Sequence, residues 1–421
     1  NKFPEFVKLL YSDKKNKWEQ FFKDYIKSED ISDGNRLYLT LIFVKAIKKV
    51  GLDNISNNSA LIINLCDLLT DYIGNGELEK DISETIGTDL RNKQLIESLR
   101  DINTIREKLA LTKKDLYVKD ENPNGVKLFQ YTSADSIQYL LKTKNKGEYG
   151  NQNLQIPSLR FTNANQMNDP IEGRLLVRAF GLSEETDYKL SNFYISSATN
   201  VEDSLPLWKQ YANEGKGICL QYSSDYLRKI IKDENVNSSD GYVNIFRECY
   251  IDIDPDKETQ NWNKISMKVS TWNREDVNIN RCIACKVRSL LQDIHDNMKE
   301  LKECSGEQYE KEIKVLRVFM NAKIGYLFKR MDYSYENEFR LSLNMQDKKD
   351  LITWEKRKMP NNNVAFKLYS YIFINDGNNK LPVEYSKVIL GPKAEDIDYI
   401  APYIKLCDKN INVESSKIRY R

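Results

Sequence analysis

Histidine is almost missing from this chain, since His295 is the only one among 421 residues. A Ser-His-Asp triad, or any other site with a histidine base, would have to be built on that single residue. Asp296 and Asn297 follow it in a stretch with helical periodicity, so we expect His295 to be solvated. The scarcity of histidine therefore argues against hydrolases that rely on a histidine base.

Three further absences narrow the class of protein. No segment approaches the run of about twenty apolar residues that crosses a membrane as a helix. The first residues show no basic start followed by an apolar run, so no secretory signal is visible. The seven cysteines are an odd number and widely scattered, which is typical of reduced thiols in a cytoplasm. The net charge of +2 is too small to indicate nucleic-acid binding by itself. We therefore expect a cytoplasmic protein with no membrane association.

Phosphate-binding and metal-binding motifs are also scarce. No glycine-rich turn followed by Lys-Ser or Lys-Thr comes after a predicted strand, which excludes a P-loop nucleotide site. Cys282 and Cys285 have the spacing of zinc ligands, but the nearest additional ligands are His295 and Cys304 rather than a second cysteine pair. Because the pair lies in a run with helical periodicity, we expect two small apolar helix residues and no metal.

The length of the chain indicates two domains, because one hydrophobic core rarely organises more than about 250–300 residues. Residues 1–118 carry apolar side chains at helical spacing, as in Trp18, Phe21 and Tyr25. We expect this part to be a helical domain that binds another protein or scaffolds the second domain. Residues 119–125 are rich in turn-forming residues and are expected to be a linker.

Residues 126–421 have a different pattern. Short apolar runs are separated by turn residues, without the regular alternation of strands and helices that is typical of a parallel sheet. Between about 276 and 330 the helical period returns, and Ser305-Gly306 divides it into two helices. The sequence therefore predicts an α+β protein whose mixed or antiparallel sheet carries an inserted helical hairpin. The predicted strands are 126–131, 158–162, 193–197, 217–222, 246–251, 335–343 and 388–390.

The strand predicted at 335–343 has two chemically different faces. Side chains alternate along a strand, so every second residue shares a face. Two carboxylates and a guanidinium on one face, with an apolar face behind them, form either a site or a charged strand edge. The apolar face would hold Tyr335, Phe339, Leu341 and Leu343, and the polar face Glu336, Glu338, Arg340 and Ser342.

Three other blocks hold candidate site residues. Asn168-Asp169-Pro170 is a turn signature, because Asp caps its own backbone and Pro disfavours a helical residue before it. A second block places Leu207, Trp208 and Tyr211 on one helical face, which core packing explains without any function. The third is the segment 130–133, a strand that ends in hydroxyl groups, where Thr132 or Ser133 is most simply a helix N-cap.

Taken in their order along the chain, these blocks resemble a bacterial family, the domain of unknown function 2971. The similarity covers roughly residues 126–395 and adds a Val-Ile-Leu-Gly strand at 388–391 to the four blocks above. Two positions depart from the family. Tyr333 stands where members often have Trp, and Gln130 stands where many members have His or Lys before the tyrosine of the first block.

The layout of this family in turn resembles a distant ADP-ribosyltransferase, which implies NAD as co-substrate. In that fold a polar residue on the first strand grips NAD, and a glutamate on a later strand closes the site. Loss of nicotinamide builds oxocarbenium character on the ribose, and a nearby carboxylate stabilises that charge. The resemblance implies Glu338 or Glu336 as the catalytic residue. The residues that it implies for the cofactor are Gln130, Tyr131, Thr132, Ser133, Asn168, Asp169, Tyr211 and Arg340.

Two alternatives stay open. In a metal-dependent nuclease, carboxylates would gather magnesium with Lys329 nearby. In a non-enzymatic sensing or interaction module, Glu338 and Arg340 would be a buried ion pair that holds the sheet. If the transferase hypothesis holds, residues 1–118 would recognise a partner or trigger of a bacterial toxin or defence effector, whose acceptor is a protein or nucleic acid. The carboxylates of the nuclease hypothesis are Asp169, Glu172, Glu336 and Glu338.

Overall fold

The structure is a computed structural model in which two compact units are distinguished. Residues 111–291 and 321–421 form the unit that holds the sheet, called here the sheet unit. The helical domain and linker expected at 1–118 and 119–125 lie outside the described residues, except for a helix among residues 101–116. In the part that is described, no helix is long and apolar enough to cross a membrane. The described residues are 101, 104–105, 107–118, 127–141, 143–146, 152–155, 157, 159–167, 173–182, 193–232, 243–254, 257–271, 277–305, 316–317, 320, 324–344, 352–357, 367–373, 375–376, 379–380 and 382–419.

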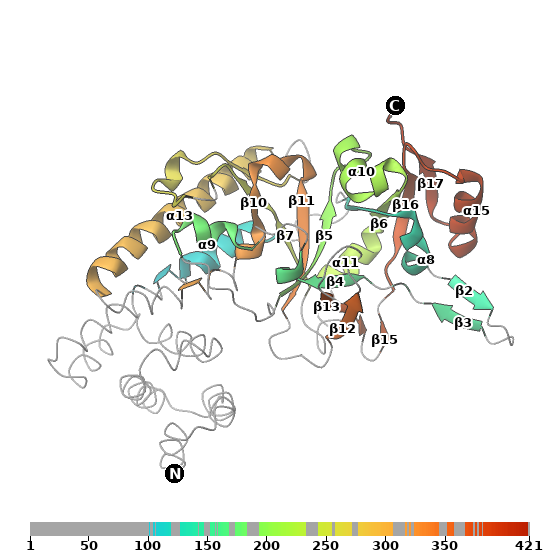
Figure 1. Cartoon of the computed structure of the whole chain (residues 1–421), viewed down its shortest axis with the longest axis horizontal. Coiled ribbons are helices and arrows are strands. Elements are labelled where there is room, and N and C mark those ends of the chain that lie inside the picture. Colours follow the sequence, from blue (N-terminus) through green and yellow to red (C-terminus); the bar gives the residue numbers. More distant parts are fainter. Residues whose placement is uncertain are drawn as a thin grey trace, which may run out of the picture. The chain divides into compact units, whose positions relative to one another are not determined.

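A ten-stranded sheet forms the centre of the sheet unit (Figure 1). Its main path runs β12-β13-β4-β5-β1-β6-β16-β17, and β11 pairs with both β5 and β7. All of these pairings are antiparallel except β16 with β17. The α+β class with a mixed sheet is therefore confirmed. The strands are β1 (Phe129–Thr132), β4 (Arg160–Asn163), β5 (Phe193–Thr199), β6 (Ile218–Tyr222), β7 (Asn244–Arg247), β11 (Glu338–Asn344), β12 (Thr353–Arg357), β13 (Lys367–Phe373), β16 (Tyr385–Leu390) and β17 (Asn412–Ser415).

The chain also forms three smaller sheets among the described residues. The strand expected at 246–251 is divided, because β7 pairs with β11 while β8 joins a second sheet of order β10-β8-β9. In that sheet β10 runs parallel to β8. Glu248 lies between β7 and β8, where the chain passes from one sheet to the other. The remaining strands are β8 (Cys249–Ile251), β9 (Met267–Val269), β10 (Phe328–Arg330) and the hairpin strands β2 (Thr143–Lys146), β3 (Gln152–Gln155), β14 (Asn375–Asp376) and β15 (Asn379–Lys380).

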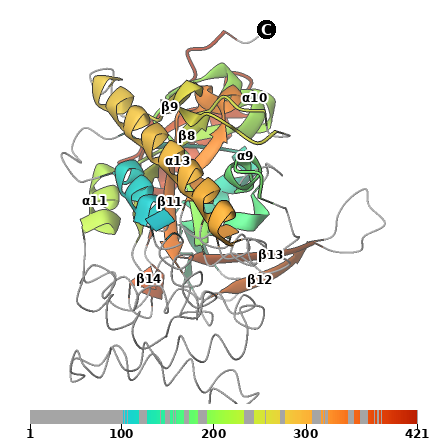
Figure 2. The ribbon, with the colours of Figure 1, turned by 90° about the vertical axis from the view of Figure 1, so that its left-hand side faces the viewer.

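The helices are mostly short. The exception is α13, a single long helix (Figure 2) that ends at Ser305, where Ser305-Gly306 predicted the end of the first insertion helix. Of the second insertion helix only 316–317 and 320 are described, and these residues are helical. The α-helices are α8 (Ile137–Leu140), α9 (Leu175–Ala179), α10 (Leu205–Tyr211), α11 (Ser224–Lys232), α13 (Val277–Ser305) and α15 (Ile397–Cys407). The 3-10 helices are η2 (Ala134–Ser136), η3 (Ala164–Gln166), η4 (Asn213–Gly215), η5 (Trp262–Lys264), η8 (Gly325–Leu327) and η9 (Met331–Glu336).

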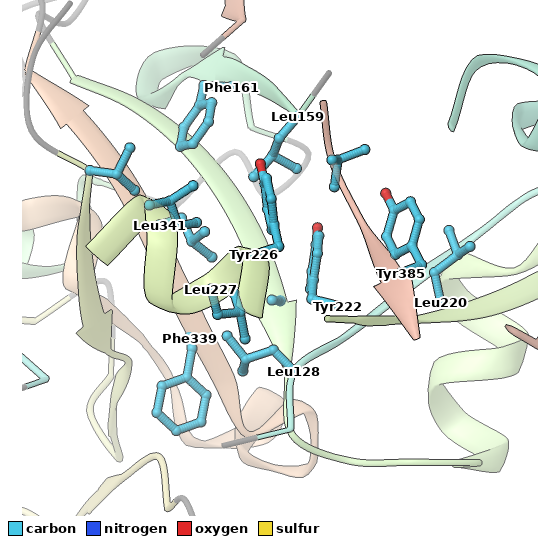
Figure 3. Packing of buried hydrophobic residues seen from close by; sticks show 14 of the residues in the cluster. Leu128, Leu159, Phe161, Leu220, Tyr222, Tyr226, Leu227, Phe339, Leu341 and Tyr385 are labelled. Carbon is cyan, nitrogen blue, oxygen red and sulfur yellow. The ribbon is translucent and has the colours of Figure 1, made fainter. Parts of the chain in front are cut away.

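The two faces of the central sheet are covered by different side chains. On one face, which we call the α11 face, apolar residues of the strands pack with those of α11 (Figure 3). Phe339, Leu341 and Leu343 belong to this cluster, so the expected apolar face of β11 is confirmed there. On the opposite face, called the α10 face, Phe129 and Tyr131 pack with Leu207 and Trp208 of α10. The polar side chains of β11 therefore lie on the α10 face.

Candidate functional site

Glu336 and Glu338 do not share a strand, which corrects one prediction. Tyr335 and Glu336 belong to the 3-10 helix η9, and β11 begins only at Glu338. Asn337 between them has a left-handed backbone with φ of 43°, a conformation that Asn tolerates better than most residues and that breaks the alternation of a strand. The Asn337 side chain accepts a hydrogen bond from the Thr271 amide (2.8 Å) and donates one to the Thr271 carbonyl (2.9 Å). This turn brings both carboxylates to one place.

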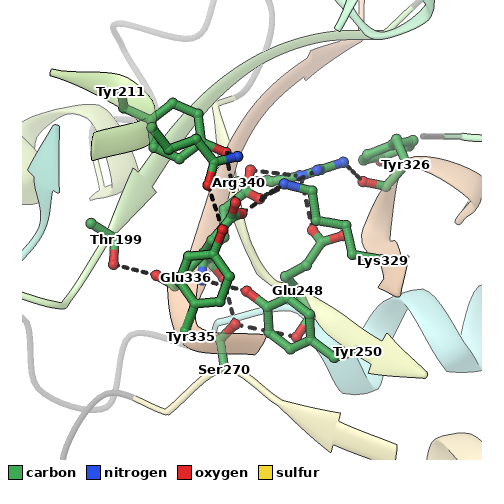
Figure 4. A network of polar contacts seen from close by, with 12 residues as sticks. Thr199, Tyr211, Glu248, Tyr250, Ser270, Tyr326, Lys329, Tyr335, Glu336 and Arg340 are labelled. Atoms are coloured by element: carbon green, nitrogen blue, oxygen red, sulfur yellow. Dashed lines mark hydrogen bonds and ion pairs between the residues drawn. The ribbon is translucent and has the colours of Figure 1, made fainter. Parts of the chain in front are cut away.

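Five ionisable side chains meet at this place, and we call them the ionic cluster. Figure 4 shows its side chains pointing toward one another, with dashed lines for their contacts. Arg340 and Glu248 are 0 % exposed, and the most exposed member, Lys329, reaches only 7 %. Charges in the interior are costly unless they are paired, so such a group of residues needs an explanation. The members are Glu248, Lys329, Glu336, Glu338 and Arg340.

The lysine of β10 joins the two glutamates. Lys329 Nζ donates to Glu336 Oε2 at 2.9 Å and to Glu338 Oε2 at 2.6 Å. Arg340 lies on the other side of Glu338, and its Nε donates to Glu338 Oε1 at 3.0 Å. Both oxygens of Glu338 are therefore held by cations, whereas only one oxygen of Glu336 is.

Arg340 has two further contacts that fix it in the sheet unit. Its Nε lies 2.8 Å from Glu248 Oε2, and both side chains are fully buried. Its Nη1 donates to the carbonyl of Tyr326, in η8 just before β10. Because the guanidinium joins β11, the β7–β8 passage and η8, it connects the central sheet with the smaller one.

Backbone hydrogen bonds hold the start of β11 in place. The Glu338 amide donates to Tyr250 Oη at 2.7 Å, and the Glu338 carbonyl accepts from Ser270 Oγ at 2.6 Å. The Glu248 amide also donates to the Glu338 carbonyl at 3.2 Å. Two residues earlier, the Glu336 carbonyl accepts from Thr199 Oγ1. The two carboxylates therefore stand on a backbone fixed on several sides.

The outer side of the ionic cluster consists of two tyrosines and a glutamine, which we call the tyrosine rim: Tyr211, Gln210 and Tyr335. Tyr211 Oη donates to Glu336 Oε1 at 2.6 Å, and Gln210 Nε2 donates to Tyr211 Oη at 3.1 Å. Tyr335 Oη donates to Gln210 Oε1, and Tyr335 is 39 % exposed. Glu336 is therefore the carboxylate in contact with the rim.

The pKa values of the cluster are strongly perturbed. Burial raises the pKa of Glu336, and the charge of Lys329 opposes this rise only in part. Burial also raises the pKa of Tyr211, with Glu336 adding to the rise. Burial alone would lower the pKa of Lys329, but the carboxylates of Glu338 and Glu336 outweigh it and raise the pKa. Lys329 is therefore charged at neutral pH.

Three carboxyl groups face two cations in the cluster, so one proton makes it electroneutral. Burial raises the pKa of Glu248 well above its ordinary value, and Glu338 adds to the rise. Among the residues described, neither carboxyl oxygen of Glu248 accepts a hydrogen bond, although Arg340 lies at ion-pair distance. We therefore place the proton on Glu248.

A glutamine at position 248 is expected to gain stability relative to the parent as the pH rises. A carboxyl group with a raised pKa keeps its proton in the folded state where the unfolded chain has lost it. The parent then loses stability above the ordinary glutamate pKa, by at most about 1.4 kcal/mol per pH unit for one group. Glutamine does not titrate, so Glu248→Gln escapes this loss. Urea unfolding of both proteins between about pH 5 and about pH 8 measures the difference. If the difference in unfolding free energy between the two proteins stayed constant with pH, it would contradict a proton on Glu248.

The first strand contributes less to this site than the resemblance implied. Phe129 and Glu338 are both register partners of Thr199 on β5, so the side chains of these three residues share the α10 face. Gln130 and Thr132 alternate with Phe129 and point to the α11 face, where Gln130 Oε1 accepts from Tyr222 Oη at 2.8 Å. The sheet therefore separates Gln130 and Thr132 from the carboxylates.

Tyr131 lies on the α10 face, but its hydroxyl is already engaged. It donates to the Val201 carbonyl at 3.0 Å and accepts from the Ser204 amide at 2.9 Å, and its ring packs edge-on against Trp208. Ser133 is the N-cap of η2, as one of the two N-cap predictions had it. The other candidates in the segment 168–172, Asn168, Asp169 and Glu172, lie outside the described residues.

Two sequence expectations concern α13. His295 is 2 % exposed, so the prediction of a solvated residue is wrong. Its position four residues after Leu291 places it on the buried side of the helix. Cys282 and Cys285 are exposed, and over the described ranges no group of three or more His, Cys, Asp or Glu side chains could hold a metal ion.

Several residues of the site were missed by sequence reasoning. Glu248 lies inside the apolar run 246–251, and a lone carboxylate in a strand of that kind was the signal that could have found it. Lys329 was considered only as a nuclease residue. Tyr250, Ser270 and Asn337 carry no motif, because their roles depend on backbone groups that the fold brings near.

Comparison with known proteins gives a family and no activity. A family described as a protein of unknown function, DUF2971, has a model that matches residues 207–341. The match is narrower than the resemblance inferred for 126–395, but it includes most of α10, the start of β11 and every member of the ionic cluster. No curated protein and no solved structure matches the chain. Residues 207–341 therefore match the domain of unknown function 2971 that the ordered sequence blocks indicated.

Proposed function

We propose that this protein releases nicotinamide from NAD, as an ADP-ribosyltransferase or an NAD glycohydrolase. The observation that carries the proposal is the position of Glu336, a buried carboxylate fixed by Lys329 on one oxygen and by Tyr211 on the other. Carboxylates with perturbed pKa values in fixed ionic surroundings are typical of functional sites. The tyrosine rim beside Glu336 is the side from which a substrate would approach.

The chemistry requires a carboxylate at the reacting sugar. Breaking the bond between the ribose carbon and the nicotinamide nitrogen leaves positive charge on the ribose, and the bonding electrons neutralise the pyridinium. An ionised Glu336 stabilises that developing charge. Water or an acceptor hydroxyl then forms the new bond and loses a proton, which a carboxylate can accept. The charge of Lys329 lowers the pKa of Glu336 and so favours its ionised form against the effect of burial.

Glu338 and Glu336 have different roles in this proposal. Glu338 is bonded on both oxygens by Lys329 and Arg340, so it positions the lysine rather than touching the substrate. Glu336 has its second oxygen on Tyr211, a hydrogen bond that a substrate group could replace. This moves the reacting carboxylate from Glu338, the first choice of the sequence resemblance, to Glu336.

The direct test is release of nicotinamide when the purified full chain is incubated with NAD. We expect free nicotinamide to accumulate with the parent protein, and with Glu395→Gln as a control. Glu395 is an exposed carboxylate that, in the part of the chain that is described, forms a surface pair with Lys216. A folded parent protein that releases no nicotinamide would contradict the proposal.

A second candidate, favoured by the complete burial of Arg340, is a non-enzymatic sensing module in which the Glu338–Arg340 pair holds the sheets together. Unfolding of Glu338→Gln, together with no activity in the parent, would support it. The nuclease hypothesis has less support, because the ammonium of Lys329 lies between the two carboxylates that would share magnesium. In the transferase proposal residues 1–118 recognise a protein partner or trigger, as in a bacterial toxin or defence effector.

A further inference from the structure

The first residues of the sheet unit, which precede the expected linker, are bonded to β7 close to the ionic cluster. We call residues 111–118 the anchor segment. Its helix ends at residue 116, Tyr117 then forms a β-bridge with Phe246, and the Val118 amide donates to the Ile245 carbonyl at 2.9 Å. Ile245 and Phe246 of β7 also pair with β11. The anchor segment therefore lies along the edge of β7 that faces away from β11.

Lys113 of the anchor segment points into a group of three aromatic rings, which we call the aromatic cage. Its Nζ lies 4.7 Å from the centre of Phe193, 5.1 Å from that of Phe246 and 5.6 Å from that of Tyr326. Phe193 and Tyr326 are stacked at 4.9 Å, and Phe246 meets Tyr326 edge-on at 6.4 Å. An ammonium within about 6 Å of a ring centre is attracted by the face of the ring. One cation therefore holds three rings together.

Two of the cage residues are also neighbours of Arg340. Phe246 is its direct register partner on β7, so the side chains of Arg340 and Phe246 share a face of the sheet. The carbonyl of Tyr326 accepts the hydrogen bond from Arg340 Nη1. A change in the packing of the cage therefore changes the position of the Arg340 guanidinium through these two contacts.

We propose that Lys113 is a positioning residue that holds Arg340 in the ionic cluster and so couples the anchor segment to the site. The coupling runs through shared contacts. Arg340 and Lys329 both bind Glu338, while Lys329 is divided between Glu338 and Glu336. When Arg340 moves away from Glu338, Lys329 binds Glu338 more closely. Glu336 then has less of the positive charge of Lys329, which favours its ionised form.

The test compares three variants of the full chain. Lys113→Met removes the cation and keeps the length of the side chain, whereas Lys113→Arg keeps a cation that can bind the rings. Lys114→Met is the matched control, because Lys114 is the next residue of the same helix and is exposed. The main readout is NMR titration of the Glu336 carboxyl carbon, which needs no enzymatic activity. The second readout is kcat and KM for nicotinamide release, which rests on the proposed function.

We expect Lys113→Met to shift the titration of Glu336 to higher pH and to lower kcat about tenfold, with little change in KM. Lys113→Arg and Lys114→Met should match the parent. A purely structural role would lower the melting temperature of Lys113→Met without moving the titration, and that result would overturn the proposal. If Lys113→Met does not fold, Phe246→Leu removes one ring of the cage, and an unshifted Glu336 titration there overturns it equally. A parent without NAD activity contradicts the proposed function but leaves the titration result decisive for Lys113.

Discussion

Replacing Arg340 by methionine is expected to lower the free energy of unfolding by about 3–5 kcal/mol, the cost of breaking a buried ion pair by removing one partner. Methionine fills a similar volume but offers no charge to Glu338, no polar partner to Glu248 and no donor to the Tyr326 carbonyl. Each of these groups stays buried after the substitution, so each keeps its desolvation cost without its partner. Urea unfolding at neutral pH measures the loss.

The chain offers a matched control in Arg330, which pairs with Asp332 at 2.6 Å while both side chains are exposed to solvent. Arg330→Met should cost less than about 1 kcal/mol, because water and salt weaken a surface pair. Similar losses for Arg340→Met and Arg330→Met would show that the ionic cluster does not depend on its guanidinium.

Replacing Glu336 by glutamine is expected to lower the rate of nicotinamide release by about 10²–10⁴-fold. Glutamine has nearly the same shape and can still accept a hydrogen bond from Tyr211. It cannot carry the negative charge that the oxocarbenium-like ribose requires, nor accept a proton from the incoming water or acceptor. The loss should fall on kcat rather than KM, because the charge matters most in the transition state.

The same assay with Glu338→Gln separates the two carboxylates. Because Glu338 is held by Lys329 and Arg340, its loss should lower stability together with activity, whereas Glu336→Gln should stay folded. A folded Glu336→Gln that releases nicotinamide at the parent rate would remove Glu336 from the mechanism. A loss confined to Glu338→Gln would then return the catalytic role to Glu338.

The parts of the fold that the sequence predicted are those that depend on local pattern. The apolar alternation of Phe339, Leu341 and Leu343 placed these residues correctly in a core, and so did the helical spacing of Leu207 and Trp208. The predicted end of α13 at Ser305 rested on a local signal as well. The spacing of apolar residues and the residue types of turns are local features, so a single sequence is enough to predict structure from them.

The parts that could not be predicted depend on neighbours distant in the chain. Alternation shows that Gln130 and Tyr131 point to opposite faces, but only the pairing of β1 and β11 with Thr199 shows which of them faces Glu338. The left-handed turn at Asn337 depends on Thr271, which accepts and donates the hydrogen bonds that stabilise it. Such partners become visible only when the strands are placed.

The position of Glu248 between two sheets has a consequence for how the chain folds. The ionic cluster joins residues from 248 to 340, and its guanidinium contacts Glu338 of the central sheet and two groups that lie just before strands of the smaller one. Its contacts are distant in sequence, and such contacts form slowly because a long loop must first be closed. We therefore expect the five ionisable groups to stay hydrated while each sheet forms, and to lose their water together in one late step. On this view the cluster acts as a checkpoint of assembly, since only a chain in which both sheets have formed can bury its charges in pairs.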